Sequence, residues 1–451
     1  MARLFGTDGA RGVAITELTC EMAMQIGRAA ALVLTKKMSH KPRIFIGKDT
    51  RISSDILEAA LCAGICSVGA DAHILGVVPT PAVAMLVRKY NADAGVMISA
   101  SHNSVEFNGI KLFSNTGYKL SDEIEEEIEA LILDNPEDIA LKSGTDLGHI
   151  TYDKNAVWDY VRYVMKTIPG DLNGIRVAID CANGSASSTA EKLFSGLGAT
   201  CYLMNCNPDG TNINEKCGST HIDMLMKFVR EQKCHVGVAF DGDADRCLAV
   251  DENGLLVDGD KMIAIFAQYM NNKGMLRNRT AVVTVMTNLG FTHFCQENAV
   301  KMEITKVGDR YVLEKMLDGG YNLGGEQSGH IIFLDDATTG DGQLCAVKLL
   351  SILAESGKKM SELSAVMERY PQVMVNVKIS SEWKNVWAND VEIKNVIARH
   401  QENLGNDGRI LVRESGTEPL VRVMVEGKNF EVINDIAIAI AEKIKERCPK
   451  A

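Results

Sequence analysis

Three short apolar segments recur along the chain, and each is followed by a small or polar turn and then by a helical pattern. These segments are residues 43–47, 176–180 and 281–285. Later in each unit a second apolar run ends in a polar loop, and these loops are residues 99–103, 241–245 and 324–330. Ligands of open α/β sheets bind at the carboxyl ends of strands. Three related α/β units are therefore expected to present these loops around one cleft.

The pattern changes after about residue 371. Residues 373–379 predict a strand, residues 384–400 a helix, residues 409–412 and 420–425 a hairpin, and residues 433–444 a final amphipathic helix. This indicates a small α+β domain. A chain of 451 residues is too long for one hydrophobic core. We therefore predict four domains, at residues 1–155, 156–255, 256–370 and 371–451.

Composition excludes several classes of protein. The formal net charge of −11 argues against non-specific nucleic-acid binding. The 12 cysteines include no Cys-x-x-Cys pair, which argues against a zinc ribbon or a thioredoxin-like site, and Cys62 and Cys66 are interpreted as core residues at helical spacing. No apolar run approaches the roughly 18 residues that span a bilayer, and no apolar signal segment is present. We expect a cytoplasmic protein with neither nucleic acid nor membrane as a partner.

Asp241, Asp243 and Asp245 alternate directly after an apolar run. Small residues between them allow the backbone to curl, and ligands that are all oxygen suit Mg²⁺ or Ca²⁺ better than zinc. An EF-hand is rejected, although Glu252 stands at the twelfth position, because Arg246 occupies the sixth position, where that loop needs glycine. The remaining alternative to a metal site is a solvated acidic turn. A second acidic stretch, residues 122–129, is interpreted as a solvated helix face.

Ser101 offers a hydroxyl in the small, polar sequence Ile-Ser-Ala-Ser-His-Asn at residues 98–103. It has no Gly-x-Ser-x-Gly elbow, which argues against an α/β-hydrolase. Lys111 could neutralise a phosphoserine or transfer a proton, or it could be an ordinary surface cation. A metal-binding loop and a serine that can carry a phosphoryl group together indicate phosphate chemistry.

Two further loops suit a phosphorylated sugar. Residues 324–330 combine glycines with side chains that can hydrogen-bond hydroxyls or an amine, although a plain strand-linking turn is the alternative. Residues 413–419 read Arg-Glu-Ser-Gly-Thr-Glu-Pro, in which arginine and small donors could cradle an anion, or the segment could be a simple hairpin turn. No P-loop lysine motif is present, so nucleotide binding of that type is not indicated.

These four loops, in this order, resemble the α-D-phosphohexomutase superfamily, and within it the bacterial branch that acts on glucosamine phosphates. The resemblance begins at residues 5–12, Phe-Gly-Thr-Asp-Gly-Ala-Arg-Gly, and extends to the loop at residue 413, so it covers nearly the whole chain. It implies an α/β protein of three related domains with mixed sheets, plus a C-terminal α+β domain with a TATA-binding-protein-like fold, in a heart-shaped arrangement. Gln327 and the Gly-Asp-Arg sequence at residues 308–310 favour the glucosamine branch.

The resemblance also implies roles for single residues. Ser101 matches the phosphorylated serine, and Asp241, Asp243 and Asp245 match the ligands of one Mg²⁺ per active site, with the phosphoserine as a further ligand. The implied catalytic groups around the transfer are Arg11, His102, Lys111 and Arg246. The implied substrate-binding groups are Glu326, Ser328, His330, Asp309 and Arg310 at the sugar, and Arg413, Ser415, Gly416, Thr417 and Arg422 at the distal phosphate. Which of Lys111, His102 and Arg11 is the general acid or base stays open.

The implied reaction interconverts glucosamine 6-phosphate and glucosamine 1-phosphate through the phosphoserine. Glucosamine 1,6-bisphosphate is the intermediate, that compound or glucose 1,6-bisphosphate is the activator, and the product feeds UDP-N-acetylglucosamine and cell-wall synthesis. The alternatives are a phosphomannomutase/phosphoglucomutase, a metal-dependent sugar-phosphate phosphohydrolase and a non-catalytic phosphosugar-binding regulator. The phosphosugar is the expected partner, and monomer and homodimer both stay open.

Overall fold

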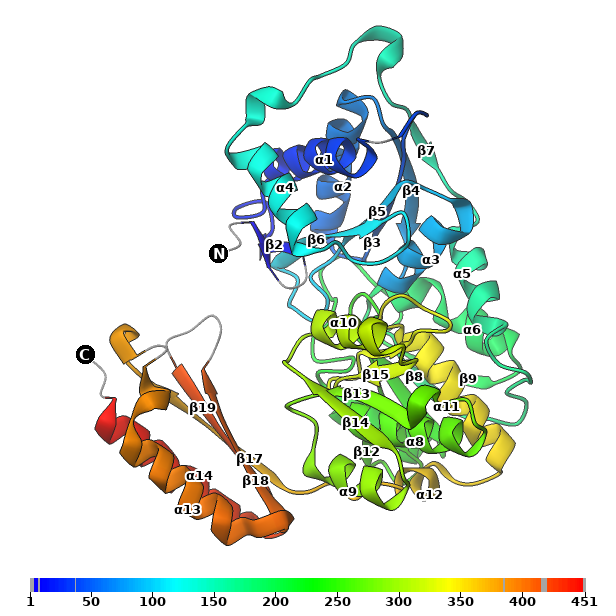
Figure 1. The fold of residues 1–451 in the computed structure, drawn as a ribbon. Helices are drawn as coiled ribbons and strands as arrows, with labels where there is room; N and C mark the ends of the chain where they lie inside the picture. Colours follow the sequence, from blue (N-terminus) through cyan, green and yellow to red (C-terminus); the bar gives the residue numbers. More distant parts are fainter. Residues whose placement is uncertain (1–3, 7–8, 37, 384–385, 415–419, 449–451) are drawn as a thin grey trace. The chain divides into compact units, whose positions relative to one another are not determined.

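The computed structural model describes residues 4–6, 9–36, 38–383, 386–414 and 420–448. The chain forms two compact units. The larger unit contains Met1–Met286 with Ala299–Val366, and the smaller contains Thr287–Asn298 with Met367–Ala451. Figure 1 traces the chain through both. The expected heart-shaped arrangement stays a prediction.

The larger unit contains three separate mixed sheets among its described residues. The first has the order β1-β2-β6-β5-β3-β4-β7, with β1 (Phe5–Gly6), β2 (Gly9–Val13), β3 (Arg43–Lys48), β4 (Asp71–Val77), β5 (Ala94–Ile98), β6 (Phe107–Ser114) and β7 (Ile150–Tyr152). The second has the order β12-β11-β10-β8-β9, with β8 (Arg176–Asp180), β9 (Thr200–Met204), β10 (Val236–Phe240), β11 (Cys247–Asp251) and β12 (Leu256–Val257). The third has the order β14-β13-β15-β16, with β13 (Thr280–Thr284), β14 (Lys301–Thr305), β15 (Leu323–Gly325) and β16 (Ile331–Phe333).

The same four-strand arrangement recurs in the three sheets. Strands β4-β3-β5-β6, β9-β8-β10-β11 and β14-β13-β15-β16 occupy equivalent positions. The two central strands pair in parallel in each case, and the second of them pairs antiparallel with the strand that follows it. The three predicted polar loops are therefore the same connection in three copies, and the predicted repeat of α/β units is confirmed.

Helices cover both faces of the first sheet. Helices α1 (Cys20–Thr35), α2 (Ile52–Ser67) and α4 (Asp122–Leu133) bury one face in a core that includes Ile44 and Ile46. Helix α3 (Thr80–Tyr90) packs on the other face, where a Cβ at Gly47 would lie 2.5 Å from Val83 Cγ2. Glycine at position 47 therefore lets α3 approach the strand closely.

The other helices of the larger unit extend the same pattern. They are α5 (Ala156–Met165), α6 (Ala190–Gly196), α7 (Asp223–Glu231), α8 (Gly259–Asn272), α10 (Asp309–Gly319), α11 (Gly342–Ser356) and α12 (Met360–Ser364). Helix α7 buries Leu225 and Val229 in the core of the second sheet, and α10 buries Val312 and Met316 in that of the third. No helix in the described parts of the chain combines the length and apolar character needed to cross a bilayer. All 12 cysteines are free; Cys62 is buried in the core as predicted, and Cys66 is half-buried and packs against that core.

The prediction of a solvated acidic face over residues 122–129 is wrong in part. Glu129 is buried, and its Oε1 accepts hydrogen bonds from the backbone N–H groups of Leu4 and Phe5, both at 2.7 Å. Glu125 lies 3.7 Å from Arg310 on α10, and Asp122 pairs with the same arginine. The helix thus holds the N-terminal strand and contacts the third domain, because its carboxylates find partners far away in sequence.

Two elements within the predicted third domain, β12 and α9, also contact segments outside it. Strand β12 pairs with β11, so the second sheet reaches Val257 rather than residue 255. Helix α9 (Leu289–Glu297) belongs to the smaller unit. Asn288 Nδ2, at the start of this helix, donates to Tyr370 O at 3.0 Å and to Glu426 Oε1 at 3.1 Å. These buried hydrogen bonds join α9 to the C-terminal domain.

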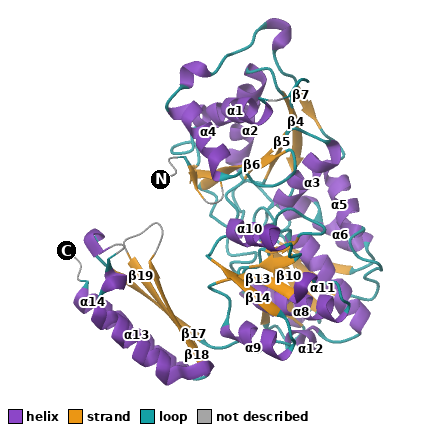
Figure 2. Ribbon diagram, in the orientation of Figure 1, coloured by secondary structure: helices purple, strands orange, loops and turns teal. Residues whose placement is uncertain are grey.

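The smaller unit is a sheet of order β17-β19-β18 with two long helices on one face, as Figure 2 shows. Besides α9, its main elements are β17 (Gln372–Lys378), β18 (Gly408–Glu414), β19 (Leu420–Gly427), α13 (Val391–Leu404) and α14 (Phe430–Arg447). The predicted strands and final helix are confirmed. Helix α13 begins at Val391 rather than at residue 384, because the Asp390 carboxylate caps it by accepting the N–H groups of Glu392 and Ile393.

We predict that Tyr160→Phe destabilises the larger unit by about 1–3 kcal/mol. The Tyr160 hydroxyl donates to Asp341 Oδ1 at 2.7 Å, and both side chains are buried. The change would leave Asp341, the N-cap of α11, with one donor fewer in a place closed to water. Urea unfolding monitored by tyrosine fluorescence would measure the loss. Tyr152→Phe, at a side chain that is 72% exposed on β7, is the control, and equal midpoints for both variants would contradict the prediction.

Candidate active site

The structure brings Ser101 and the aspartate cluster into contact. Ser101 follows β5 in the first domain and Asp241 follows β10 in the second, 140 residues later. The Ser101 hydroxyl donates to Asp241 Oδ2 at 2.6 Å, and both residues are 1% exposed. Two of the three equivalent loops therefore meet through a buried hydrogen bond.

The three aspartates form one buried group. Each offers a carboxylate oxygen, and these oxygens all lie within 4.8 Å of one another. The turn is tight: Ala244 has φ +56°, and a Cβ at Gly242 would lie 2.5 Å from Ser101 O. Burial and the neighbouring charges of Asp245 and Asp243 raise the pKa of Asp241 well above its ordinary value. The solvated-turn alternative is therefore wrong.

The aspartate cluster offers oxygen atoms that could hold a cation. Asp245 Oδ1 accepts no hydrogen bond from the described residues, and Arg246 Nε is 3.9 Å away. Asp241 Oδ1 accepts the backbone N–H of Arg246 at 3.1 Å. Three buried oxygen ligands whose charges repel one another fit a hard divalent ion.

Lys111 is a buried part of this cluster rather than a surface cation. It lies on β6, is 1% exposed, and its Nζ is 2.7 Å from Asp243 Oδ2 and 3.6 Å from Asp245 Oδ2. Asp243 Oδ2 also accepts the Thr80 hydroxyl at 2.6 Å. Both contacts join the first domain to the metal loop, and the lysine offsets part of its negative charge.

His102 lies beside Ser101, and the charges of two arginines act on its ring. His102 Nδ1 lies 3.4 Å from Ser101 Oγ. Burial and the charges of Arg246 and Arg11 lower the pKa of His102 to about 4, so its ring is neutral near pH 7. Burial opposes ionisation of Arg246, but Asp241 and Asp245 raise its pKa above the ordinary value. Arg11 lies on β2, opposite Gly109 on β6.

The part of the third loop that follows β15, residues 326–330, is held against β11 of the second domain and against the start of α8. Gly329 O accepts the backbone N–H of Cys247 at 3.0 Å, and Gln327 O accepts that of Gly259 at 3.0 Å. Glu326 Oε1 accepts the backbone N–H of Gly308 at 3.0 Å, while Ser328 is exposed. The loop after β15 thus reaches the residue that directly follows Arg246.

His330 connects the third loop to the metal loop and to helix α10. It is 3% exposed, and its Nε2 lies 3.9 Å from Asp245 Oδ2 and 3.7 Å from Asp309 Oδ2. Asp309 also pairs with Lys119. Arg310, predicted to bind substrate, pairs with Glu314 at 3.1 Å and with the α4 carboxylates described above.

The smaller unit places two arginines opposite each other. Arg413 on β18 and Arg422 on β19 are directly paired across the antiparallel strands. Burial and the charge of Arg422 lower the pKa of Arg413. Like charges in this position repel each other unless an anion lies between them. The other residues predicted for this loop, Ser415, Gly416 and Thr417, lie outside the described residues, as do Thr7 and Asp8 of the N-terminal motif.

Sequence reasoning missed four buried polar residues that contact the predicted site. Thr80 binds the metal loop, and Asp49, Arg51 and Asn214 lie around the Ser101 loop. One signal was available for two of them, because Asp49 and Arg51 follow the first repeated strand in the way that Asp241 follows β10. Thr80 and Asn214 carry no such signal.

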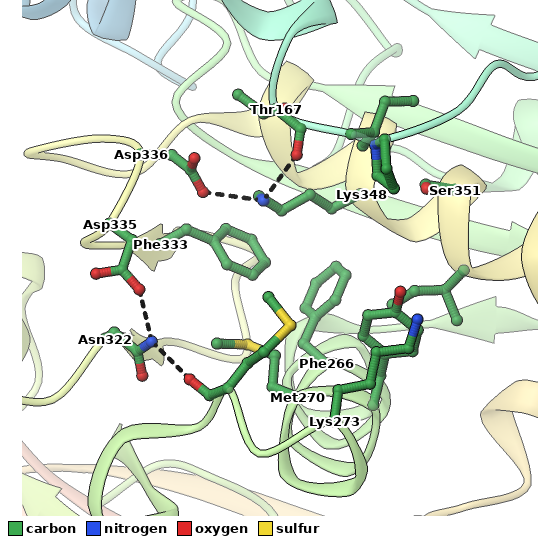
Figure 3. Close-up of a pocket in the computed structure, with 15 residues that line it drawn as sticks. Thr167, Phe266, Met270, Lys273, Asn322, Phe333, Asp335, Asp336, Lys348 and Ser351 are labelled. Carbon is green, nitrogen blue, oxygen red and sulfur yellow. Dashed lines mark hydrogen bonds and ion pairs between the residues drawn. The ribbon is translucent and has the colours of Figure 1, made fainter.

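A separate cavity of about 330 Å³ contains none of the predicted site residues (Figure 3). Its walls include Phe266, Met270 and Phe333. Four of its polar lining residues pair with one another: Asn322 Nδ2 with Asp335 Oδ2 at 2.7 Å, and Lys348 Nζ with Asp336 Oδ2 at 2.9 Å. The cavity is therefore a mainly apolar space between α8, α11 and β16, apart from the aspartate cluster.

All four domains match models of one protein family. The matches are to phosphoglucomutase/phosphomannomutase domain I at residues 2–138, domain II at residues 158–254, domain III at residues 258–370 and the C-terminal domain at residues 374–443.

Among solved structures, a phosphoglucomutase/phosphomannomutase family protein from Burkholderia thailandensis superposes with a TM-score of 0.82 at 22% identity, covering 99% of this chain and 98% of the other. Aspergillus fumigatus N-acetylphosphoglucosamine mutase, in complex with GlcNAc-6P and magnesium, gives 0.69 at 18% identity, covering 99% and 96%. At these identities the likeness shows the fold.

Full-length relatives are far more similar in sequence. Phosphoglucosamine mutase from Clostridium perfringens is 55% identical over 99% of this chain and 100% of its own length. That from Ruminiclostridium cellulolyticum is 54% identical over 99% and 100%. With every domain matched and this identity along the whole length, the chain belongs to the phosphoglucosamine mutases of the phosphoglucomutase/phosphomannomutase family.

Proposed function

We propose that this protein interconverts glucosamine 6-phosphate and glucosamine 1-phosphate, using Ser101 as the phosphoryl carrier and glucosamine 1,6-bisphosphate as the intermediate. The observation that carries the proposal is the buried contact of 2.6 Å between the Ser101 hydroxyl and Asp241 of the aspartate cluster. A hydroxyl in this place can take a phosphoryl group directly beside a metal site. The product would serve UDP-N-acetylglucosamine and cell-wall synthesis in the cytoplasm.

The aspartate cluster and the phosphorylated Ser101 would hold one Mg²⁺. The fit rests on three buried carboxylates with oxygens within 4.8 Å, on ligands that are all oxygen, and on the Asp245 oxygen described above. Bound there, Mg²⁺ would neutralise charge on the transferring phosphoryl group. A. fumigatus N-acetylphosphoglucosamine mutase, which has the same fold, was solved with magnesium.

The protein's own side chains would supply the rest of the transfer. Lys111 and Arg246, both beside the cluster, would bind oxygens of the moving phosphoryl group and stabilise its charge. When Ser101 loses its phosphoryl group to a sugar hydroxyl, the serine oxygen must gain a proton and the sugar hydroxyl must lose one. We propose that the neutral ring of His102, 3.4 Å from Ser101 Oγ, exchanges a proton with that oxygen.

Two groups of residues would hold the sugar and its second phosphate. Glu326, Ser328, His330 and Asp309 are proposed to contact the sugar, and the Arg413–Arg422 pair with residues 415–417 would bind the phosphate that is not reacting. Gln327 and the sequence at 308–310 support a preference for the amino sugar. Arg310 already pairs with α4 carboxylates and Glu314, so its proposed sugar contact requires it to exchange partners.

The proposed function is tested by assaying glucosamine, glucose and mannose phosphates side by side. We expect the highest kcat/KM with glucosamine phosphate and no accumulation of inorganic phosphate. Peptide mass spectrometry should find phosphate on Ser101, and Ser101→Ala should abolish turnover. Ser104→Ala, at an exposed serine of the same loop, is the matched control and should keep wild-type activity.

Other results of these assays would indicate a different function for the protein or for Ser101. An equal or higher kcat/KM with glucose or mannose phosphate would move the protein to the phosphomannomutase/phosphoglucomutase alternative. Release of one inorganic phosphate per substrate would make it a phosphohydrolase. Normal mutase turnover by Ser101→Ala would remove Ser101 from the reaction.

We predict that Asp245→Asn lowers activity by about 100-fold and weakens Mg²⁺ binding. Asparagine keeps the shape of the side chain but removes one of the negative charges that would hold the ion. Isothermal titration calorimetry would measure Mg²⁺ affinity, and turnover would be measured with and without EDTA. Asp223→Asn, at an exposed position on α7, is the control. Full turnover by EDTA-treated protein without added metal would show that the cluster does not act through a cation.

We predict that Arg413→Ala lowers kcat about 10- to 100-fold in both directions of the reaction. Binding energy from a remote phosphate can position the reacting end, so its loss affects turnover as well as KM. Ser101 phosphorylation and Mg²⁺ affinity should stay at wild-type values, because Arg413 lies in the smaller unit. Arg399→Ala, at an exposed residue of α13, is the control in the same unit. Steady-state kinetics equal to wild type would exclude Arg413 from substrate binding.

A further inference from the structure

The backbone of the Ser101 loop is held by two side chains from different domains. Arg51 Nη2, from the first domain, donates to Ser101 O at 3.1 Å and to Asn103 O at 2.8 Å. Asn214 Nδ2, from the second domain, donates to the same two oxygens at 2.8 Å and 2.9 Å. Each carbonyl therefore receives two donors, which uses both of its lone pairs. We call these two side chains the loop clamp.

Arg51 is itself fixed by a buried network. Its Nε lies 3.1 Å from Asp49 Oδ2, and both side chains are completely buried. The same Asp49 oxygen accepts the Ser99 hydroxyl at 2.7 Å, and Ser99 Oγ accepts the backbone N–H of Ser101 at 2.9 Å. An ion pair followed by two hydrogen bonds thus connects Arg51 with the N–H of Ser101, and a hydrogen bond connects it with the carbonyl.

Asn214 joins the Ser101 loop to the metal loop. It is 7% exposed, its φ of +58° lies in the left-handed region, and its backbone N–H donates to Ala182 O at 2.9 Å. A Cβ at Gly242 would lie 2.9 Å from Asn214 Nδ2 and 2.5 Å from Ser101 O. The amide therefore occupies the space where the two loops meet.

The loop clamp holds Ser101 in a strained backbone conformation. Ser101 has φ +52°, in the left-handed region that is unfavourable for a non-glycine residue. In that conformation its hydroxyl is 2.6 Å from Asp241. A loop free to relax to negative φ would turn the hydroxyl away from the aspartate cluster, and a small misplacement of a reacting group can cost about 100-fold in rate.

We infer that Arg51 and Asn214 are positioning residues for phosphoryl transfer: they bind the carbonyls of Ser101 and Asn103 and so hold the Ser101 oxygen at the metal loop. This inference rests on the proposed role of Ser101 as phosphoryl carrier. Neither side chain is assigned a contact with the sugar or with the transferring phosphoryl group. Their loss should therefore affect turnover and the protection of the phosphoserine from water, and leave substrate affinity nearly unchanged.

Asn214→Gly tests the clamp, because glycine accepts the left-handed backbone and removes only the amide. We expect kcat to fall about tenfold while KM for glucosamine phosphate stays within about twofold of wild type. We also expect more inorganic phosphate released per turnover, because a loosened phosphoserine admits water. Asn278→Gly is the matched control: its φ is +54° and its amide donates to Gly319 O, away from the Ser101 loop.

Two further variants complete the test. Asn214→Asp keeps the shape but removes the donors, and it should reproduce the loss of kcat. Arg51→Lys keeps the charge beside Asp49 but replaces the fork with a single ammonium, and it should lower kcat with the same unchanged KM. Phosphate release and kcat equal to the control in all three variants would overturn the inference, and so would failure of both Asn214 variants to fold, which would make the amide a requirement of folding.

The wild-type protein separates this inference from the proposed function. No mutase turnover by the wild type would defeat the proposed function itself. Wild-type turnover together with full activity and unchanged phosphate release in Asn214→Gly would defeat the clamp alone.

Discussion

The burial of three carboxylates beside one another is the constraint on which the larger unit depends. Asp241, Asp243 and Asp245 are almost completely closed to water, where like charges cost the most free energy. The cost is offset by partners from other segments: Lys111 at 2.7 Å from Asp243, and the Ser101 and Thr80 hydroxyls at 2.6 Å from their carboxylates. These same contacts join the first domain to the second. The interactions that offset the charge of the carboxylates therefore also hold the two halves of the site together.

Repetition of one topology explains why unlike loops meet. In each of three sheets, the connection after the second central strand leads to an antiparallel neighbour. The first copy carries Ser101, the second the aspartates and the third Glu326 and His330. The strand topology is common to all three sheets, and the side chains on each loop give each part of the site a different chemistry. Backbone hydrogen bonds such as Cys247 to Gly329 O hold neighbouring copies together.

Features that depend only on consecutive residues could be predicted from the sequence. Alternating aspartates after an apolar run, a serine in a small polar loop and the three repeated strands are all local patterns, and the structure places them as neighbours. Partners that are far away in sequence could not be predicted. Nothing near Asn214 indicates a bond to Ser101 O, and nothing near Glu129 indicates that it binds the N–H groups of Leu4 and Phe5. Likewise, the start of α9 is joined to the C-terminal domain because Asn288 bonds Tyr370 and Glu426, a pairing that no local pattern contains.

By itself, the sequence determined the repeat of α/β units, the C-terminal α+β domain and the chemical character of each loop, because hydrophobic periodicity and ligand type are properties of short segments. Only the tertiary structure decided the state of each group. Lys111 is buried as a partner of Asp243 instead of being a surface cation. Burial, together with the nearby charges of Arg246 and Arg11, lowers the pKa of His102 and makes its ring neutral. Hydrogen bonds from Arg51 and Asn214, which belong to two different domains, hold Ser101 at a positive φ. Charge state and backbone strain depend on which distant groups share a region closed to water, and only the folded chain brings those groups together.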